Sequence, residues 1–139
     1  MTPEQIRLVQ ESWKQLQPSA PQAAGLFYSR LFALDPSVRK LFRTDLQEQG
    51  TRLMSMISVA VGGLSRLESI VPAVQDLGRR HARYGVEERH YSVVGAALVW
   101  TLQQQLGKAF TAEVEQAWRT VYGVLSTTMQ QAAASQEIA

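Results

Sequence analysis

The chain has 139 residues, of which 45% are hydrophobic, and this length and composition suit one domain with one hydrophobic core. Charged residues make up 19% of the chain and the formal net charge is only +2, which argues against a nucleic-acid-binding protein because such proteins neutralise many phosphates. The absence of cysteine excludes disulfides, iron–sulfur clusters, thiolate metal sites and cysteine nucleophiles.

Signals for targeting or for membrane insertion are missing from the sequence. The N-terminus has no basic region followed by an apolar run, so we expect no signal peptide. The most apolar stretches, such as residues 93–102, are too short to cross a bilayer. We therefore expect a cytoplasmic protein that does not contact membranes.

Helix-start signals and apolar spacing predict three helices in the first third of the chain. A capping-box pattern begins at Thr2 and is followed by an apolar stripe with spacings of three and four residues. Pro18 and Pro21 end this helix and open a second one, which is expected to run to about Ala33. Asp35 and the proline after it then begin a short helix.

The middle of the chain predicts three further helices. A polar corner, Arg43 to Glu48, leads into a helix whose end is loosened at Gly62. The next apolar stripe is stopped by Gly85, and the strongly apolar segment from about Glu88 to Leu106 is expected to form a central helix.

The remaining residues complete an all-α prediction. Thr111 is expected to cap the last helix, and the tail at residues 132–139 is expected to fray. No segment alternates with period two between turn residues, so no strand is predicted. The expected architecture is one all-α domain over residues 1–139, with six or seven helices.

His81 lies on the apolar stripe of its predicted helix, four residues after Leu77. From this spacing alone the ordinary interpretation is a core histidine with unremarkable hydrogen bonds. The alternative is an axial ligand to a metal or to haem, which requires a neutral imidazole in an apolar cavity. The only other histidine is His90, and no paired-histidine motif, phosphate-binding glycine loop or nucleophile motif is present, so a hydrolase is not expected.

Three other groups of side chains have both a plain and a functional interpretation. Gln49 precedes Leu53 by four residues and so shares its side of the helix, where a glutamine is usually a solvated rim residue. The Tyr28 hydroxyl is expected at or inside the core, where packing is the commoner role. The arginines near His81 form a solvated face by default, or meet the carboxylates of an anionic ligand.

Taken in order, these motifs resemble those of bacterial globins. The distal half is matched by Leu26-Phe27-Tyr28, by Asp35-Pro36 through Leu41-Phe42, and by Gln49 with Leu53. The proximal half is matched by Leu77 through Val86 and by His90 through Gly95, and the last helix by Ala117-Trp118 and Val121 through Leu125. The resemblance covers nearly the whole chain. It extends to the globin domain of flavohaemoglobins and is closer to single-domain globins of the Hell's Gate type.

The resemblance implies a three-over-three globin fold around one haem b. It makes His81 the single protein ligand of the iron on the proximal side and stacks Phe42 on the haem plane. It implies that Tyr28 and Gln49 donate hydrogen bonds to bound O2, while Leu53 limits access. The other implied haem contacts are Arg52, Leu77, Arg80, Val86, Tyr91 and Val94, with Arg80 preferred over Arg52 as the partner of a propionate.

Two departures from the resembled families affect the expected chemistry. The distal position is a glutamine and not a histidine, so a bis-histidyl iron, as in vertebrate neuroglobin, is not expected. Flavohaemoglobins carry a last-helix glutamate that polarises the proximal histidine, and here that position aligns with Ser135, with Glu137 close by. The chain also ends where a flavohaemoglobin continues into its flavin domain, so any electrons are expected from a separate reductase.

The expected function is reversible binding of O2, and of CO and NO, at pentacoordinate ferrous iron. The alternative is a nitric oxide dioxygenase that works with a separate reductase. A third possibility is a haem-free helical domain that binds a partner, against which the pocket residues argue. We expect a monomer or a weak homodimer.

Overall fold

The computed structural model describes residues 1–42 and 45–138, with side chains up to residue 134. Within this part the chain forms six α-helices, four short 3₁₀ helices and no strand. The α-helices are α1 (Pro3–Leu16), α2 (Ala20–Leu34), α3 (Leu46–Gly62), α4 (Leu67–Arg83), α5 (Glu88–Leu106) and α6 (Ala112–Ile138). The 3₁₀ helices are η1 (Gln17–Ser19), η2 (Pro36–Leu41), η3 (Leu64–Arg66) and η4 (Gly107–Ala109).

Local signals at the helix ends explain where several elements begin and stop. The Thr2 hydroxyl accepts a hydrogen bond from the Gln5 amide, and the Gln5 side chain accepts one from the Thr2 amide, which completes the predicted capping box of α1. Gly107 ends α5 with a φ of 55°, a left-handed conformation that favours glycine. The Thr111 hydroxyl accepts from the Val114 amide at 3.2 Å at the start of α6.

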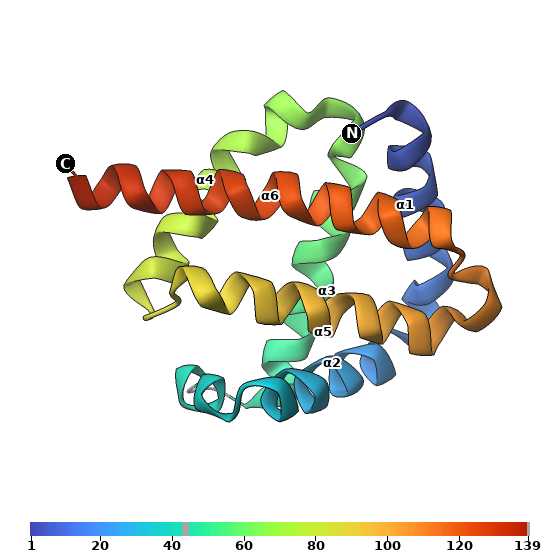
Figure 1. Ribbon diagram of the computed structural model, residues 1–139, viewed down its shortest axis with the longest axis horizontal. Coiled ribbons are helices and arrows are strands. Elements are labelled where there is room, and N and C mark those ends of the chain that lie inside the picture. Colours follow the sequence, from blue (N-terminus) through green and yellow to red (C-terminus); the bar gives the residue numbers. More distant parts are fainter. Residues whose placement is uncertain (43–44, 139) are drawn as a thin grey trace.

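The helices form two crossing layers of three (Figure 1). In this view α2, α5 and α6 run roughly horizontally, and α1, α3 and α4 run across them. The largest helix–helix contacts join the two layers or neighbours within a layer, namely α4 with α6, α2 with α5, and α1 with α6. This arrangement is the predicted three-over-three sandwich.

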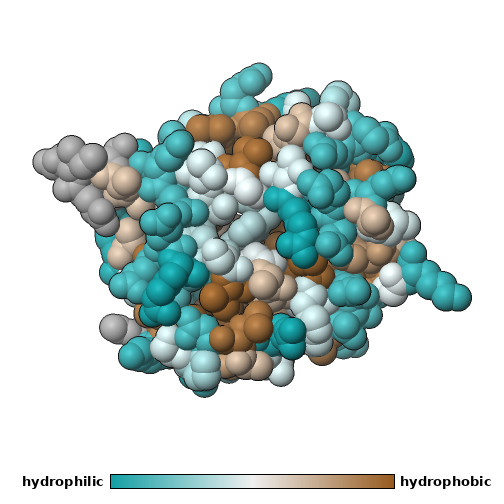
Figure 2. Space-filling model, in the orientation of Figure 1, coloured by the Kyte–Doolittle hydropathy of each residue, from teal (hydrophilic) through white to brown (hydrophobic). Residues whose placement is uncertain are grey.

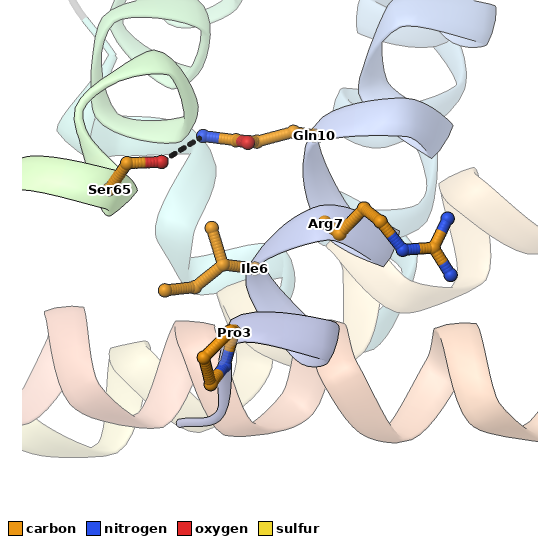
Figure 3. Close-up of a pocket in the computed structure, with 5 residues that line it drawn as sticks. All are labelled: Pro3, Ile6, Arg7, Gln10 and Ser65. Atoms are coloured by element: carbon orange, nitrogen blue, oxygen red, sulfur yellow. Dashed lines mark hydrogen bonds between the residues drawn. The ribbon is translucent and has the colours of Figure 1, made fainter.

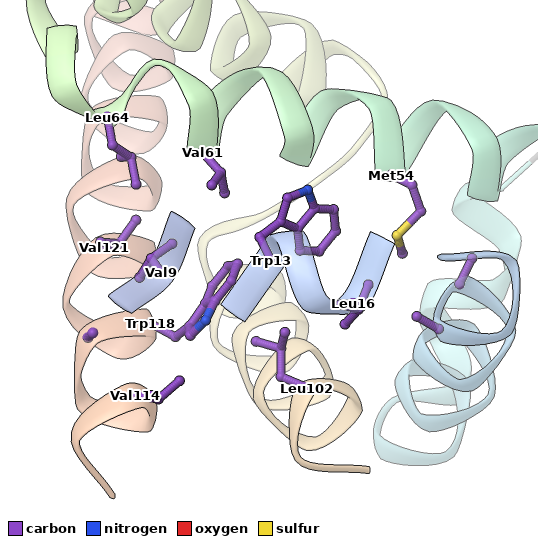
Figure 4. Packing of buried hydrophobic residues seen from close by; sticks show 13 residues of the cluster. Val9, Trp13, Leu16, Met54, Val61, Leu64, Leu102, Val114, Trp118 and Val121 are labelled. Carbon is purple, nitrogen blue, oxygen red and sulfur yellow. The ribbon is translucent and has the colours of Figure 1, made fainter. Parts of the chain in front are cut away.

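The main hydrophobic core lies where α1, α3, α5 and α6 meet (Figure 4). Val9, Leu16, Leu64, Leu102 and Val121 are among its fully buried side chains. The rings of Trp13 and Trp118 are 6.0 Å apart, and each indole donates a hydrogen bond to a serine hydroxyl. This core holds the two layers together at the end of the molecule that is remote from His81.

Two segments differ from the sequence prediction. The short helix after Asp35 is a 3₁₀ helix, begun by the Asp35 carboxylate, which accepts a hydrogen bond from the Ser37 amide at 3.1 Å. The segment from residue 132, where fraying was expected, continues as part of α6 to Ile138, and Ala132 is buried. Glutamines and alanines favour helix strongly here, and α6 is supported along its length by α4.

On the face in Figure 2 the apolar side chains form separate groups among polar ones. In the described part of the chain, no single helix is long and apolar enough to cross a membrane.

Candidate functional site

The candidate site residues lie on α3, α4, α5 and the aromatic cluster of α2, and α3 and α4 are joined by η3 but do not pack extensively on each other. Each packs instead on the other layer, α3 against α2 and α4 against α6. The apolar side chains of Leu53 on α3, Leu77 on α4 and Val94 on α5 are only half-buried. Apolar side chains that are not fully buried can contact an apolar ligand.

Several candidate distal residues belong to an aromatic cluster that gathers side chains from four segments. Phe27, Tyr28, Leu31, Val38 and Ala97 form its buried centre. The half-buried side chains that pack on this centre include Phe42, Leu53 and Val94. The structure therefore brings four of the predicted site residues, Tyr28, Phe42, Leu53 and Val94, into one cluster.

Tyr28 lies at the middle of the aromatic cluster. Its ring contacts that of Phe42 edge-on at 5.3 Å and is stacked on that of Phe32 at 6.0 Å. The residue is only 5% exposed, and burial raises the pKa of its phenol to about 12. The hydroxyl thus stays protonated at neutral pH and can act as a hydrogen-bond donor.

Gln49 and Arg52 lie on α3, upstream of and next to Leu53. Gln49 is half-buried. Its backbone N–H donates a hydrogen bond to the Asp45 backbone carbonyl at 2.9 Å, within the first turn of the helix. Arg52 is exposed and pairs with Glu48 one turn earlier, at 2.8 Å. Its predicted role toward a propionate stays a prediction, because the structure gives it a partner on its own helix.

His81 is half-buried on α4, and its ring is oriented by its own helix. Nδ1 lies 2.8 Å from the Leu77 carbonyl, which can only accept a hydrogen bond, so Nδ1 carries the proton and Nε2 is left with its lone pair. Among the described residues Nε2 has no hydrogen-bond partner. The pKa of His81 is lowered overall, mainly by burial. The positive charge of Arg80 also lowers this pKa, whereas the hydrogen bond to the Leu77 carbonyl raises it. The result is a neutral imidazole suited to binding a metal.

The backbone of α4 is held in place by a close contact with α6. A Cβ atom built on Gly78 would lie 2.3 Å from the Met129 carbonyl oxygen and 2.6 Å from its Cα. Only glycine permits this approach between the two helices. Gly78 is three residues before His81, so this contact sets the position of the helical turn that carries the imidazole.

The turn after α4 and the start of α5 complete the proximal side. The Val86 amide donates to the His81 carbonyl at 3.0 Å. The Tyr122 hydroxyl donates to the Tyr91 carbonyl at 2.6 Å and ties α6 to the first turn of α5. Burial raises the pKa of Tyr91, and burial together with the nearby Tyr91 phenol raises that of Tyr122. The side chains of Ser135 and Glu137 lie outside the described part of the chain.

His90 has a structural role that sequence reasoning did not identify. It is 4% exposed, and its Nδ1 accepts a hydrogen bond from the Glu87 amide at 2.8 Å at the start of α5. The Glu87 side chain in turn accepts from the third backbone N–H of the helix. One nitrogen of His90 is therefore used to cap α5.

Arg80 pairs with Asp76 at 3.3 Å and is about half exposed, so its predicted pairing with a propionate also stays a prediction. The aromatic cluster contains side chains that the sequence analysis did not select for the site, Phe32, Leu46 and Leu98 among them. Phe32 follows Tyr28 by four residues, a spacing that would have shown that the two rings share a face.

These residues fit a haem better than a bare metal ion. In the described residues there is no group of three or more histidine or acidic side chains that could hold a metal ion. One neutral imidazole whose Nε2 has no hydrogen-bond partner among the described residues is the kind of ligand that a haem iron takes, and the apolar and aromatic side chains of the cluster suit the contacts that a haem makes. A separate shallow pocket between α1 and η3, lined by Ile6, Arg7, Gln10 and others, lies outside this arrangement (Figure 3).

Comparisons of the sequence with a family model and with known proteins point to the same family. The family model described as Globin matches residues 25–129. The chain is 32% identical to a neuroglobin of Tetraodon nigroviridis, over 88% of this chain and 86% of that protein. It is 30% identical to a flavohemoprotein of Bacillus subtilis, over 87% of this chain but only 31% of that longer protein.

A solved structure supports the same fold. An engineered carbene transferase, derived from a candidate nitric oxide dioxygenase of Rhodothermus marinus, superimposes with a TM-score of 0.89. The match covers 99% of this chain and 96% of the other, at 24% identity.

Proposed function

Because this chain belongs to the globin family, we propose that it holds one haem b between α3 and α4 and binds O2 reversibly, with CO and NO as alternative ligands. The observation that carries the proposal is the hydrogen bond from His81 Nδ1 to the Leu77 carbonyl, which leaves Nε2 as the proposed ligand of the iron. We take residues 1–139 as one globin domain.

The distal side supports gas binding through its donors. His81 would hold the haem, and a bound haem would supply an iron atom that can take up a diatomic gas. Tyr28 keeps its proton because its phenol is buried, and it is the proposed first donor to the gas. Gln49 is the proposed second donor, and Leu53 with Phe42 keeps water away from both. Such donors slow the release of a polarised ligand.

Stopped-flow measurement of O2 dissociation tests this proposal. Tyr28→Phe is expected to speed release by about ten- to hundredfold, because it removes one hydrogen bond to a charged acceptor. Gln49→Leu is expected to speed it less. Tyr84→Phe is the matched control, since Tyr84 is 66% exposed. Release rates equal to wild type in both distal variants would contradict the donor roles.

The second candidate function is nitric oxide dioxygenation, in which O2 and NO are converted to nitrate. It is favoured by the similarity to flavohemoproteins and by the likeness in fold to the candidate nitric oxide dioxygenase of Rhodothermus marinus. Such an activity would need a bound haem and one electron per NO converted, and we propose that a separate reductase would supply that electron. Sustained consumption of NO in the presence of NADH and a flavin reductase supports this activity. Consumption limited to one NO per haem contradicts it.

A further inference from the structure

One ion pair joins two segments that lie far apart in the sequence. Arg89 Nη1, in the first turn of α5, lies 3.1 Å from Asp35 Oδ2 at the start of η2. Every other ion pair of the described residues connects side chains that are two to four positions apart. The two segments lie at the same end of the molecule, on the left of Figure 1. We call this ion pair the η2–α5 link.

The two carboxylate oxygens of Asp35 have different partners. Oδ1 accepts hydrogen bonds from the Ser37 amide at 3.1 Å and from the Ser37 hydroxyl at 2.5 Å, and so begins η2 locally. Oδ2 accepts the charge-assisted hydrogen bond from Arg89, and the Asp35 side chain is only 15% exposed. The hydrogen bond from the Ser37 hydroxyl holds the pKa of the Asp35 carboxyl below its usual value, and the charge of Arg89 acts in the same direction. One oxygen therefore serves the local turn and the other serves the link.

The α5 end of the link is held by further hydrogen bonds. Arg89 Nε also donates to the Glu87 carboxylate at 3.0 Å, and the Glu87 amide donates to Nδ1 of buried His90 at 2.8 Å. The residue before Glu87 is Val86, whose amide donates to the His81 carbonyl at 3.0 Å. The guanidinium is therefore presented by the segment that follows His81, on the proximal side of the proposed site.

The η2 end of the link leads to Phe42, which directly follows this short helix. A 3₁₀ helix of six residues has poor hydrogen-bond geometry, so its position depends on the contacts around it. Val38 buries the middle of η2 in the aromatic cluster. At the far end, Leu41 lies beside the turn after α4, since a Cβ atom built on Gly85 would be 3.4 Å from its Cδ2. The η2–α5 link holds the near end.

The position of η2 determines how the Phe42 ring meets the aromatic cluster. Its centroid lies 5.3 Å from that of Tyr28 and 5.6 Å from that of Phe32, and both contacts are edge-on. Such ring contacts depend on the relative orientation of the rings, so a displacement of η2 changes the packing around Tyr28. The link therefore connects the segment after His81 with the ring of the proposed gas donor.

We propose that Asp35 and Arg89 are positioning residues, whose link holds η2 against the start of α5 and thereby sets the Phe42 ring against that of Tyr28. An effect on gas release rests on the proposed function, because it acts through the Tyr28 donor. The placement of Phe42 does not rest on it, and the test of this placement needs neither haem nor gas.

Fluorine NMR of the full chain, labelled with 4-fluorophenylalanine, tests the placement of Phe42. Spectra are recorded under CO with dithionite, so that any bound haem is diamagnetic. The four phenylalanines give four signals, which Phe→Leu variants assign. Asp35→Asn keeps an oxygen for Ser37 but turns an amide toward the guanidinium, and Arg89→Gln removes the guanidinium. Each should shift the Phe42 signal and leave that of Phe110, in the other core, in place.

The double variant and two controls separate the link from its neighbours. Because both substitutions break one link, the double variant should shift the Phe42 signal no further than either single one. Ser37→Ala and Glu87→Gln alter neighbouring bonds but leave Asp35 Oδ2 with Arg89, so they should leave the signal in place. An unmoved signal in both link variants, an equal shift in either control, or additive shifts in the double variant would overturn the proposal.

The effect on gas is tested by stopped-flow O2 dissociation from the haem-loaded protein. Asp35→Asn and Arg89→Gln should each speed release by at least about twofold, whereas Glu87→Gln should not change it. Release as slow as in wild type, with the Phe42 signal displaced, would overturn the effect on release and leave the positioning role standing. A wild type that binds no O2 would instead contradict the proposed function, without affecting the fluorine result.

Discussion

The two halves of the proposed site, the distal residues around Tyr28 and the proximal residues around His81, are built in different ways. On the distal side, Tyr28, Phe42 and Leu53 are brought together by rings and aliphatic groups from segments that are distant in sequence. On the proximal side, the imidazole of His81 is oriented by a hydrogen bond within its own helix, and α4 is positioned by backbone contact with α6 at Gly78. Side-chain packing therefore positions the proposed gas donor Tyr28, whereas local helix geometry and one glycine position the proposed iron ligand His81.

The largest effect is expected from the proximal side. His81→Ala should remove the only proposed iron ligand and weaken haemin binding by more than about a hundredfold. This loss exceeds the about ten- to hundredfold that is typical when a residue hydrogen-bonded to a metal ligand is removed. His90→Asn is the matched control, because the asparagine carbonyl can accept the Glu87 amide at the start of α5. Haemin titrations followed at the Soret band measure both. Equal loss of affinity in the two variants would contradict the assignment of His81.

A smaller effect is expected where α4 meets α6. Gly78→Ala should lower the free energy of unfolding by about 1–3 kcal/mol, because its methyl group would collide with the backbone of Met129. Gly123→Ala on α6 is the matched control, since nothing lies within 4 Å of a Cβ atom there, and it should raise stability by about 0.5–1 kcal/mol. Urea unfolding of the two proteins measures the difference in sign. Stabilisation by both changes would show that α4 does not approach α6 so closely.

The smallest effect is an alkaline one on the distal side. The pKa of Tyr28 is raised from 10.0 to about 12 by burial, so the folded state holds a proton that the unfolded state has released between these values. The contribution of the Tyr28 phenol to the free energy of unfolding is fully present below pH 10 and is lost as the pH rises toward 12. Tyr28→Phe should lose less stability over this interval, by up to about 2 kcal/mol. Urea unfolding from pH 9 to pH 12 measures how the free energy of unfolding changes with pH in the two proteins. The same change in wild type and in Tyr28→Phe would contradict the burial of the phenol.

The sequence predicts the local parts of this account better than the tertiary ones. Two examples are the capping box at Thr2 and the helix from about Glu88 to Leu106. Both follow from signals within a few residues, and the structure confirms them. The all-α globin architecture follows from the order of the motifs and is also confirmed.

What the sequence analysis missed depends on contacts between distant segments. The close approach of Gly78 to Met129 joins residues on two helices, and no pattern within either helix indicates it. The pairing of Arg52 with Glu48 competes with any anionic ligand, although its spacing of four residues was visible in the sequence. The continuation of α6 beyond residue 132 was missed because chain ends are expected to fray, whereas this one is rich in helix-forming residues.

The absorption spectrum of the purified ferrous protein, recorded before and after addition of CO, tests the central claim most directly. A single proximal ligand with Gln49 opposite it predicts a five-coordinate ferrous spectrum with a sharp Soret band, which CO converts to a six-coordinate one. A six-coordinate ferrous spectrum without CO would contradict the claim that His81 is the only protein ligand, and the absence of a Soret band after haemin addition would contradict the haem site itself.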